Sequence, residues 1–488
     1  MFSFFLSSGF FLGWSLGAND ASNVFGTAVG SRMIKFRTAA IYCSIFVILG
    51  AVISGAGASH TLGKLGAVNA IAGAFLVAFS AALSVYLMTL ARFPVSTSQA
   101  IVGAIIGWNL FSGSVTDMNA LTKIVSTWIF CPLLAASIAI ILYKTTTFTI
   151  SRFRIRMFRL DVITRYSLLL AGIFGSYALG ANNIANVMGV FVPVAPFDTI
   201  TLLGINFSPA QQLFFLGGIA IAVGVFTYSK RVMMTVGSGI FQLSPVAASV
   251  VVWSHSAVLF LFSSQALEAW LLSHHLPSIP LVPVSSSQAI VGAVIGIGLL
   301  KGGKGIRWKT VAGITSSWIT TPIISLLICF ISLFFLQHVF QQNTFIPVEY
   351  GLTQGAMDRL AKSELPHEQL KPLMWKEFPN GRKFKKAIHS TAELTKEQAR
   401  SILITAELFE VEISDDTLRH LPADSYNPEQ MKVLTKLEGR SFQHKWEIKE
   451  ALAELSDSFK FRPGDKDWNN YLNEFFQDLF SRLRNQDN

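Results

Sequence analysis

The sequence predicts an all-α polytopic membrane protein, formed by a tandem duplication and followed by a small, mainly helical soluble domain. Three observations carry this prediction. Residues 1–349 hold only 18 Lys/Arg and 6 Asp/Glu, long hydrophobic runs recur there, and three motifs occur twice in the same order. The runs are about 20 residues long, which is the length that an α-helix needs to cross a bilayer.

The hydrophobic runs set the expected membrane spans. Lys and Arg lie mostly in short loops between these runs, a pattern that sets orientation across a membrane and does not indicate nucleic-acid binding. The clearest expected spans lie at 38–58, 69–91, 121–143, 210–228 and 311–336.

Three repeated motifs define two copies within the membrane part. "GANDASN" at 17–23 returns as "GANNIAN" at 180–186, "PVSTSQAIVGAIIG" at 94–107 as "PVSSSQAIVGAVIG" at 283–296, and "STWIFCP" at 126–132 as "SSWITTP" at 316–322. Internal repeats of this kind predict a duplicated architecture. We expect a first transmembrane repeat at 1–143, a basic cytoplasmic linker at 144–165, a second repeat at 166–340 and a soluble domain of unassigned role at 350–488.

Loop charge predicts the orientation of the copies. With the N-terminus outside and five crossings in each copy, sixteen Lys/Arg fall in inside loops and only Lys64 and Lys123 fall outside. An odd number of crossings inverts the second copy, and ten crossings return the C-terminal domain to the outside. Inverted repeats with broken helices are the architecture of many secondary transporters, whose substrate site lies near the midplane of the membrane.

The first repeated motif places polar residues inside an apolar span. Asp20 is the only one of the six acids in residues 1–349 that lies well inside such a span, and ionisable residues there are costly and commonly functional. Gly17 predicts a break in the helix that frees carbonyl oxygens for a hard cation such as Na⁺. The alternative is that the asparagines only hydrogen-bond neighbouring helices. The predicted cation-binding residues are Asn19, Asp20, Asn23, Asn182, Asn183 and Asn186.

The second repeated motif predicts an anion site. Pro94 favours the first turn of a helix, and the hydroxyls that follow lie beside the free N–H groups of that turn. A helix start with extra donors suits a tetrahedral oxyanion, and two such starts from inverted copies would hold it from two sides. The alternative is ordinary capping by Ser and Thr. The predicted anion-binding residues are Ser96, Thr97, Ser98, Gln99, Ser285, Ser286, Ser287 and Gln288.

Other polar residues give weaker indications. His255 lies in the middle of an apolar run, where a hydrogen-bonded packing role is favoured over a proton relay. The chain has no nucleotide-binding P-loop, so it has no site for ATP-driven transport. We expect no metal beyond a coupling cation, no other cofactor and no enzymatic activity.

The duplicated G-A-N-D-x-x-N signature, each copy followed by P-V-S-T/S-S, resembles the inorganic phosphate transporter (PiT) family over about residues 1–340. The resemblance implies an inverted-repeat fold and symport of inorganic phosphate with Na⁺ or H⁺. By matching positions, it implies that Asp20, Asn23, Asn183 and Asn186 serve the cations and that Thr97, Ser98, Ser286 and Ser287 serve phosphate.

The chain departs from the family pattern at three positions. Gln99 and Gln288 stand where the family usually has His, and Asn183 stands where the second signature usually has Asp. An amide keeps the shape of a carboxylate but removes its charge, which leaves the cation and its stoichiometry open.

Two other functions stay open at this point. A site of dipoles and hydroxyls does not by itself separate phosphate from sulfate or another tetrahedral oxyanion, and the resembled family includes sulfate permeases. A channel or a membrane receptor is disfavoured by the duplicated buried polar motifs. Inorganic phosphate and the lipid bilayer are the partners that the transporter interpretation requires, and it leaves a homodimer open.

Overall fold

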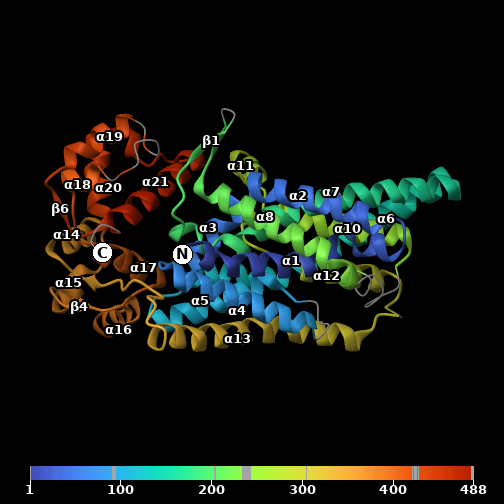
Figure 1. Cartoon of the computed structure of the whole chain (residues 1–488), viewed down its shortest axis with the longest axis horizontal. Helices are drawn as coiled ribbons and strands as arrows, with labels where there is room; N and C mark the ends of the chain where they lie inside the picture. The colour runs from blue at the N-terminus through green and yellow to red at the C-terminus, as the bar shows by residue number, and fades with distance from the viewer. Residues whose placement is uncertain are drawn as a thin grey trace. The chain divides into compact units, whose positions relative to one another are not determined.

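The computed structural model describes residues 2–66, 68–90, 95–202, 205–233, 243–303, 305–419, 421, 426 and 428–484. The chain forms two compact units (Figure 1). The first unit comprises Met1–Phe111, Thr116–Ala195 and Phe207–Thr344. The second comprises Ser112–Val115, Pro196–Asn206 and Phe345–Asn488.

The first unit is helical throughout its two copies. The helices of the first copy are α1 (Phe2–Gly30), α2 (Phe36–Ser54), α3 (Ala56–Leu65), α4 (Ile71–Leu90), α5 (Thr97–Ser112) and α6 (Met118–Phe153). Those of the second copy are α7 (Met157–Met188), η1 (Val192–Val194), α8 (Pro209–Thr227), α10 (Pro245–Leu261), α11 (Gln265–Ser273), α12 (Ser286–Leu300) and α13 (Trp308–His338). Between α7 and α8, strands β1 (Ile200–Leu202) and β2 (Ile205–Phe207) pair in a two-stranded sheet, which lies almost entirely in the stretch Pro196–Asn206 of the second unit.

Length and hydropathy confirm a polytopic membrane protein. Six described helices are long and apolar enough to span a bilayer, namely α2, α4, α6, α7, α8 and α13. Helices α10 and α11 add a seventh span if their pair, bent by 68°, is counted as one. Helix α12 is apolar but shorter, and it begins inside the unit at a buried serine.

The expected helix breaks at the first repeated motif are absent, so that prediction was wrong. Helix α1 runs without interruption through 17–23, and α7 runs without interruption through 180–186. A continuous helix keeps its backbone carbonyls bonded, so cation ligands at these motifs have to come from side chains. The expected linker at 144–165 is also mostly helical, because α6 ends at Phe153 and α7 begins at Met157.

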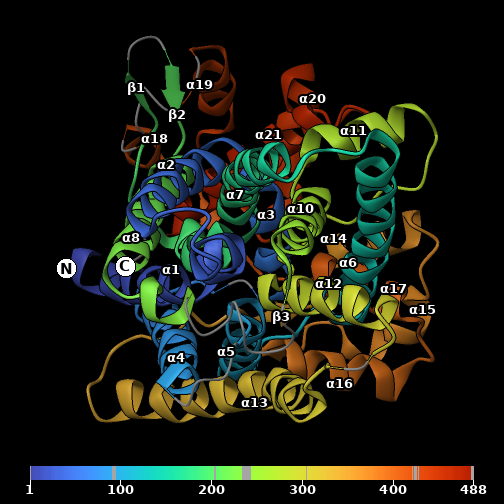
Figure 2. The same ribbon diagram turned by 90° about the vertical axis from the view of Figure 1, so that its right-hand side faces the viewer.

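Glycines explain why the motif carries Gly17 without a break. A Cβ on Gly17 would overlap the carbonyl oxygen of Ile221 in α8, and a Cβ on its counterpart Gly180 would overlap that of Val47 in α2. Only glycine lets two helix backbones approach so closely. The first helix of each copy therefore packs on the second helix of the other copy (Figure 2).

The later helices exchange partners between copies in the same way. Gly103 in α5 lies against the carbonyl oxygen of Pro322 in α13, and its counterpart Gly292 in α12 lies against that of Pro132 in α6. The two prolines belong to the third repeated motif. The duplication predicted from the sequence is thus reproduced in the packing, because each glycine–carbonyl contact has an equivalent with the roles of the two copies exchanged.

Contacts along these pairs also fix helix direction. Gly13 and Gly17 of α1 approach Gly217 and Ile221 of α8 in that order, so α1 and α8 run in the same direction. Gly180 approaches Val47, and Ile184 approaches Gly55, at the end of α2, so α2 and α7 also run in the same direction.

The second unit contains two small hydrophobic cores, each beside a two-residue antiparallel ladder. The ladder of β3 and β4 pairs Tyr350 with Phe378, and that of β5 and β6 pairs Val411 with Phe442. The first half of the second unit contains β3 (Tyr350–Gly351), α14 (Gln354–Lys362), α15 (His367–Leu370), η2 (Lys371–Leu373), β4 (Glu377–Phe378), α16 (Gly381–Thr391) and α17 (Lys396–Ala406). Its second half holds β5 (Val411–Glu412), α18 (Asp415–Arg419), α19 (Pro428–Leu434), η3 (Thr435–Leu437), β6 (Ser441–Phe442), α20 (Lys445–Leu455), η4 (Asp457–Phe459) and α21 (Lys466–Arg484).

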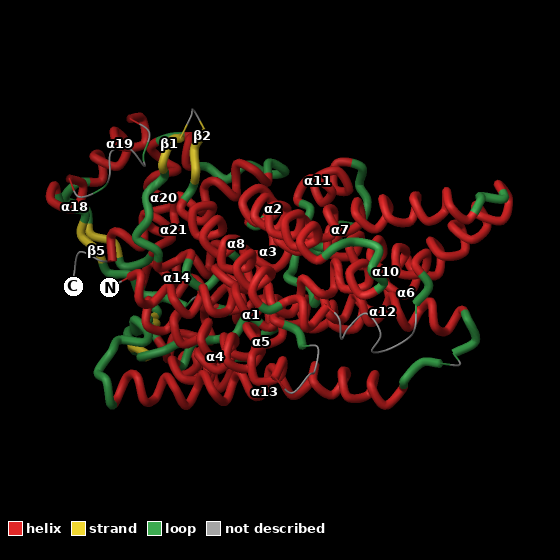
Figure 3. Tube along the Cα trace, turned by 45° about the vertical axis from the view of Figure 1, so that its right-hand side comes forward, coloured by secondary structure: helices red, strands yellow, loops and turns green. Residues whose placement is uncertain are grey.

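The two halves of this unit are similar, which the sequence analysis did not detect. Each half leads from its second strand into an eleven-residue helix, α16 or α20, and ends with a further helix, α17 or α21. Thr395 and Gln398 form a capping box at the start of α17. Figure 3 shows how little strand the described residues contain.

Replacing a close-contact glycine in either copy should destabilise the first unit. Gly50 lies against the carbonyl oxygen of Tyr177 and Gly224 against that of Trp14, so Gly50→Ala and Gly224→Ala force these backbones apart. We expect each to lower the free energy of unfolding by about 1–3 kcal/mol, measured as a lower thermal midpoint in detergent. Gly63→Ala in α3 is the control, because its Cβ would meet no atom within 4 Å. Unchanged midpoints for Gly50→Ala and Gly224→Ala would contradict the close packing.

Candidate functional site

The structure brings both repeated motifs together inside the first unit. Helices α1 and α7 carry the asparagine-rich motifs, and α5 and α12 begin at the Ser/Thr motifs. All fourteen predicted site residues are buried, each with 3% or less of its surface exposed. Pro94 and its neighbours 91–93 lie outside the described residues.

Asp20 is bonded within its own copy. Its Oδ2 accepts a hydrogen bond of 3.1 Å from Thr97 Oγ1 at the start of α5. Its other oxygen, Oδ1, is buried and has no hydrogen-bond partner among the described residues. A buried carboxylate with an unused acceptor is suited to a bound cation, because an unpaired charge is costly away from water.

Two asparagines reach across the copies. Asn23 Nδ2 of the first copy donates to Ser286 Oγ at the start of α12, at 3.0 Å. Asn186 Nδ2, its counterpart in the second copy, donates to Ser98 Oγ in α5, at 2.8 Å. Each motif is therefore linked to the helix start of the other copy, and the four elements form one connected network.

Asn183 differs from its counterpart Asp20 in how its polar atoms are used. Its Nδ2 donates to the carbonyl oxygen of Leu179 at 3.3 Å, while its Oδ1 accepts from Asn186 Nδ2 at 3.0 Å. Ser98 Oγ also lies 3.5 Å from that oxygen. The amide thus keeps one oxygen in the network and turns a donor toward the backbone, where a carboxylate would place a second acceptor.

Asn182 and Asn19 have partners away from the helix starts. Asn182 donates to the carbonyl oxygen of Val282 at 3.1 Å and accepts from the N–H of Val284 at 2.9 Å, which holds the extended segment before α12. Asn19 Nδ2 donates to Thr89 Oγ1 at 3.4 Å. The nitrogen and the oxygen of the Asn182 side chain each bond the backbone of this segment.

The first serine of each Ser/Thr motif is a helix cap. Ser96 Oγ accepts from the N–H of Gln99 at 3.3 Å, and Ser285 Oγ accepts from the N–H of Gln288 at 3.2 Å. These are ordinary capping contacts at equivalent positions. The remaining hydroxyls of the first turns are at positions 97, 98, 286 and 287.

Several buried acceptors of the network have no hydrogen-bond partner among the described residues. They include side-chain oxygens of both motifs, each with almost no exposed surface. The atoms are Asp20 Oδ1, Gln99 Oε1, Asn186 Oδ1 and Gln288 Oε1. Amide and carboxylate oxygens are ligands that hard cations prefer. No group of three or more His, Cys, Asp or Glu side chains that could hold a metal ion occurs among the described residues.

His255 belongs to the network, which the sequence analysis did not expect. It lies in α10 and is fully buried, and its Nε2 lies 2.8 Å from Ser286 Oγ. The signal available in the sequence was its position in the middle of an apolar run. Its partner is 31 residues further along the chain, so spacing alone did not connect the two.

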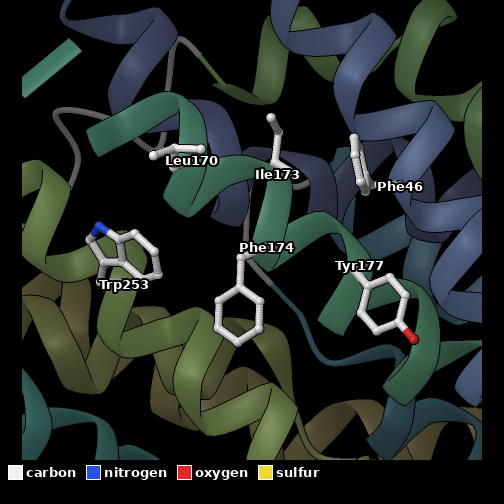
Figure 4. Close-up of a pocket in the computed structure, with 6 residues that line it drawn as sticks. All are labelled: Phe46, Leu170, Ile173, Phe174, Tyr177 and Trp253. Atoms are coloured by element: carbon white, nitrogen blue, oxygen red, sulfur yellow. The ribbon is translucent and has the colours of Figure 1, made fainter. Parts of the chain in front are cut away.

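A separate groove on the first unit contains none of the site residues. It has a volume of about 460 Å³ and is lined by Phe46, Leu170, Ile173, Phe174, Tyr177 and Trp253 (Figure 4). Its apolar lining matches a surface that faces lipid.

Comparison with known proteins supplies the family. The sequence model of the phosphate transporter family matches residues 16–164, 159–268 and 267–405, so the match extends into the second unit. A relative named "Putative phosphate permease", from Methanocaldococcus jannaschii, is 30% identical over 323 residues, which cover 66% of this chain and 93% of the relative. The sulfate permease CysP of Bacillus subtilis is 29% identical over 364 residues, which cover 72% of this chain and 93% of that protein.

A solved structure of "the sodium-dependent phosphate transporter" has a similar fold. The TM-score is 0.53 at 21% sequence identity, and the match covers 68% of this chain and 99% of that chain. Since the family model matches well over half of the sequence, including both copies of the membrane unit, the chain belongs to the phosphate transporter family.

Proposed function

We propose that the protein is a secondary active transporter that carries inorganic phosphate in symport with Na⁺ or H⁺. The observation that carries this proposal is the buried network in which Asp20 is bonded to one helix start while Asn23 and Asn186 are each bonded to the helix start of the other copy. The family and the name of the M. jannaschii relative support phosphate as the substrate.

The two helix starts supply the anion half of the site. The first N–H groups of a helix have no partner within it, and the positive end of the helix dipole favours an anion there. Helices α5 and α12 both begin at buried residues, Thr97 and Ser286, and each adds hydroxyl donors. An oxyanion between them would receive donors from both copies.

Asp20 supplies the cation half. Thr97, in the first turn of α5, donates to one oxygen of Asp20. A cation bound to the other oxygen of Asp20 would therefore be separated from this anion-binding helix start only by the Asp20 carboxylate and Thr97. Cation and anion would then neutralise each other in the membrane interior, which couples their binding.

We infer that the two copies are inverted with respect to each other. Helices α1 and α2 are joined by only five residues, and consecutive spans cross a membrane in opposite directions. Because α7 runs with α2 and α8 runs with α1, α7 and α8 oppose their counterparts α1 and α2 in the first copy. A site between inverted copies can open to either side by rocking of one part against the other.

Arsenate should compete with phosphate for uptake, whereas sulfate should compete much less. The network contains unused acceptors, such as Gln99 Oε1 and Gln288 Oε1, beside its donors. Phosphate and arsenate carry a proton at neutral pH that can satisfy an acceptor, and sulfate does not. Radiolabelled phosphate uptake into proteoliposomes, with protein-free liposomes as control, measures the competition. Equal competition by sulfate would favour a sulfate permease, the function of the B. subtilis relative.

Asp20→Asn should abolish cation-driven phosphate accumulation while the protein stays folded. The change keeps the shape and removes a charge whose attraction for a cation at about 4 Å is ~4 kcal/mol at an effective dielectric near 20. The measurement is phosphate uptake driven by a Na⁺ or a pH gradient. Asp161→Asn is the matched control, because Asp161 lies on the exposed part of α7. Normal accumulation by Asp20→Asn would remove this residue from coupling.

Asn183→Asp should strengthen the dependence of transport on Na⁺. A carboxylate at this position would turn an oxygen toward the carbonyl of Leu179, where the amide now donates, and a cation between them would relieve the repulsion. We expect tighter Na⁺ activation, by a factor of ten or so, and a higher Hill coefficient for Na⁺. Sodium and pH dependences equal to those of the parent would show that this asymmetry has no part in coupling.

The second unit is proposed to lie outside the cytoplasm, with the N-terminus also outside. Residues 112–115, between α5 and α6, and 196–206, between α7 and α8, belong to this unit. Asp198 pairs with Arg482 of α21 at 2.6 Å, and the carbonyl of Gly113 accepts from the N–H of Arg382. These loops are poor in Lys and Arg, while the basic loops alternate with them along the chain, which supports this orientation. Two of the basic residues used in that count, Arg92 and Lys304, lie outside the described residues.

An impermeant thiol reagent tests the orientation in intact cells. The three native cysteines are buried, so a cysteine introduced at the exposed Ser363 provides the signal. We expect Ser363→Cys to be labelled and Arg156→Cys, in the turn between α6 and α7, to be protected until the cells are opened. The reverse pattern would invert the proposed orientation.

A further inference from the structure

His255 is the one titratable group of the network to which neither sequence motif assigns a role. It is fully buried in α10, which packs against α1, α6, α7 and α12. Its Nε2 lies 2.8 Å from Ser286 Oγ, and its Nδ1 has no hydrogen-bond partner among the described residues. Among the described residues, the hydrogen-bond partner of His255 is therefore one serine, at the start of α12.

The hydroxyl of Ser286 has one hydrogen and two acceptor sites. Asn23 Nδ2 donates to one of these sites at 3.0 Å. A neutral imidazole carries its hydrogen on one nitrogen, and unpaired N–H donors are rarer in protein interiors than unpaired acceptors. This preference assigns the hydrogen to Nε2, which then donates to the second acceptor site and leaves Nδ1 as the acceptor without a partner.

The other first-turn hydroxyls are already in use. Thr97 donates to Asp20 Oδ2 at 3.1 Å, and Ser98 donates to the carbonyl oxygen of Val284 at 3.1 Å. Ser287 Oγ lies 3.0 Å from Ser285 Oγ, and one hydrogen of these two hydroxyls joins them. With both acceptor sites of Ser286 filled, its hydrogen has no acceptor among the described residues and is free for a ligand.

We propose that His255 is a positioning residue of the anion site: with Asn23, it reserves the hydroxyl hydrogen of Ser286 for the bound oxyanion. This inference rests on the proposed function and identifies a hydroxyl that is ready for phosphate before the ligand arrives. A histidine that instead accepted from Ser286 would consume the same hydrogen, so the direction of this one bond sets whether the hydroxyl binds an anion. Pre-orientation of a donor strengthens binding because no reorganisation is needed when the ligand enters.

Three substitutions at His255 separate positioning from packing. His255→Gln places an amide N–H near the position of Nε2, His255→Asn is one methylene too short to reach Ser286, and His255→Leu has no donor. In proteoliposomes, the Michaelis constant for phosphate should rise roughly tenfold in the Leu and Asn variants, with kcat changed less than about twofold. The Gln variant should stay within about threefold of the parent.

A double-mutant cycle with Ser286→Ala tests whether His255 acts through that serine. In the Ser286→Ala background, His255→Asn should add no further loss, because the hydroxyl that it positions is gone. Ser254→Ala is the matched control on the same helix, since Ser254 is buried and its hydroxyl donates to the carbonyl oxygen of Val250. It should leave the Michaelis constant unchanged.

The possible outcomes are distinct. A parent-like Michaelis constant in His255→Asn, or an equal loss with and without Ser286, would overturn the positioning role. A large rise of the Michaelis constant for phosphate in His255→Gln would also overturn it, because a donor at the position of Nε2 would then not be what preserves the affinity for phosphate. Should His255→Leu not fold, the Asn variant and the cycle still decide. A parent protein that neither binds nor transports phosphate would overturn the proposed function itself.

Discussion

Helices that begin inside an apolar interior leave N–H groups without partners, and much of the membrane unit is arranged around two such starts. Helices α5 and α12 begin at Thr97 and Ser286, both buried. An unpaired polar group in such surroundings costs several kcal/mol, so each start needs partners at hand. Ser96 and Ser285 each accept a hydrogen bond from one of these N–H groups, while Asn23 and Asn186 donate to first-turn hydroxyls of the other copy and so supply further donors. Under the proposed function, the bound anion supplies the acceptors that the remaining N–H groups need.

Much of this arrangement could be predicted from the sequence, because it rests on length, hydropathy and repetition. The membrane spans, the duplication and the residues of the network follow from these properties. The continuous helices could not be predicted, since Gly17 suits a helix break and a close helix contact equally well, and only its neighbour Ile221 decides between them. The engagement of Asn182 with Val282 and Val284, and the contact between His255 and Ser286, depend on distant parts of the chain that no local pattern brings together.

The two copies have similar folds but different electrostatics. Asp20 and Asn183 occupy equivalent places, yet one offers two acceptors and a charge while the other commits its nitrogen to Leu179. Among the described residues, the hydrogen-bond partner of His255 is Ser286 at the start of α12 in the second copy, which adds to the difference. In a duplicated scaffold of this kind, one copy can supply the charged residue while the other supplies neutral hydrogen-bonding groups. The two repeated motifs can therefore have different roles.

The exchange of helix partners between copies has a consequence for how the protein is made. Helix α1 packs on α8, α2 on α7, α5 on α13 and α6 on α12. During synthesis, the first copy enters the bilayer before any of these partners exists, and its glycine-lined surfaces meet lipid until the second copy follows. Neither half contains its own complete core. Packing of the unit can therefore be completed only after the last span has been inserted. A chain truncated after the first copy would lack these partners and would be expected to be degraded instead of working as a smaller transporter.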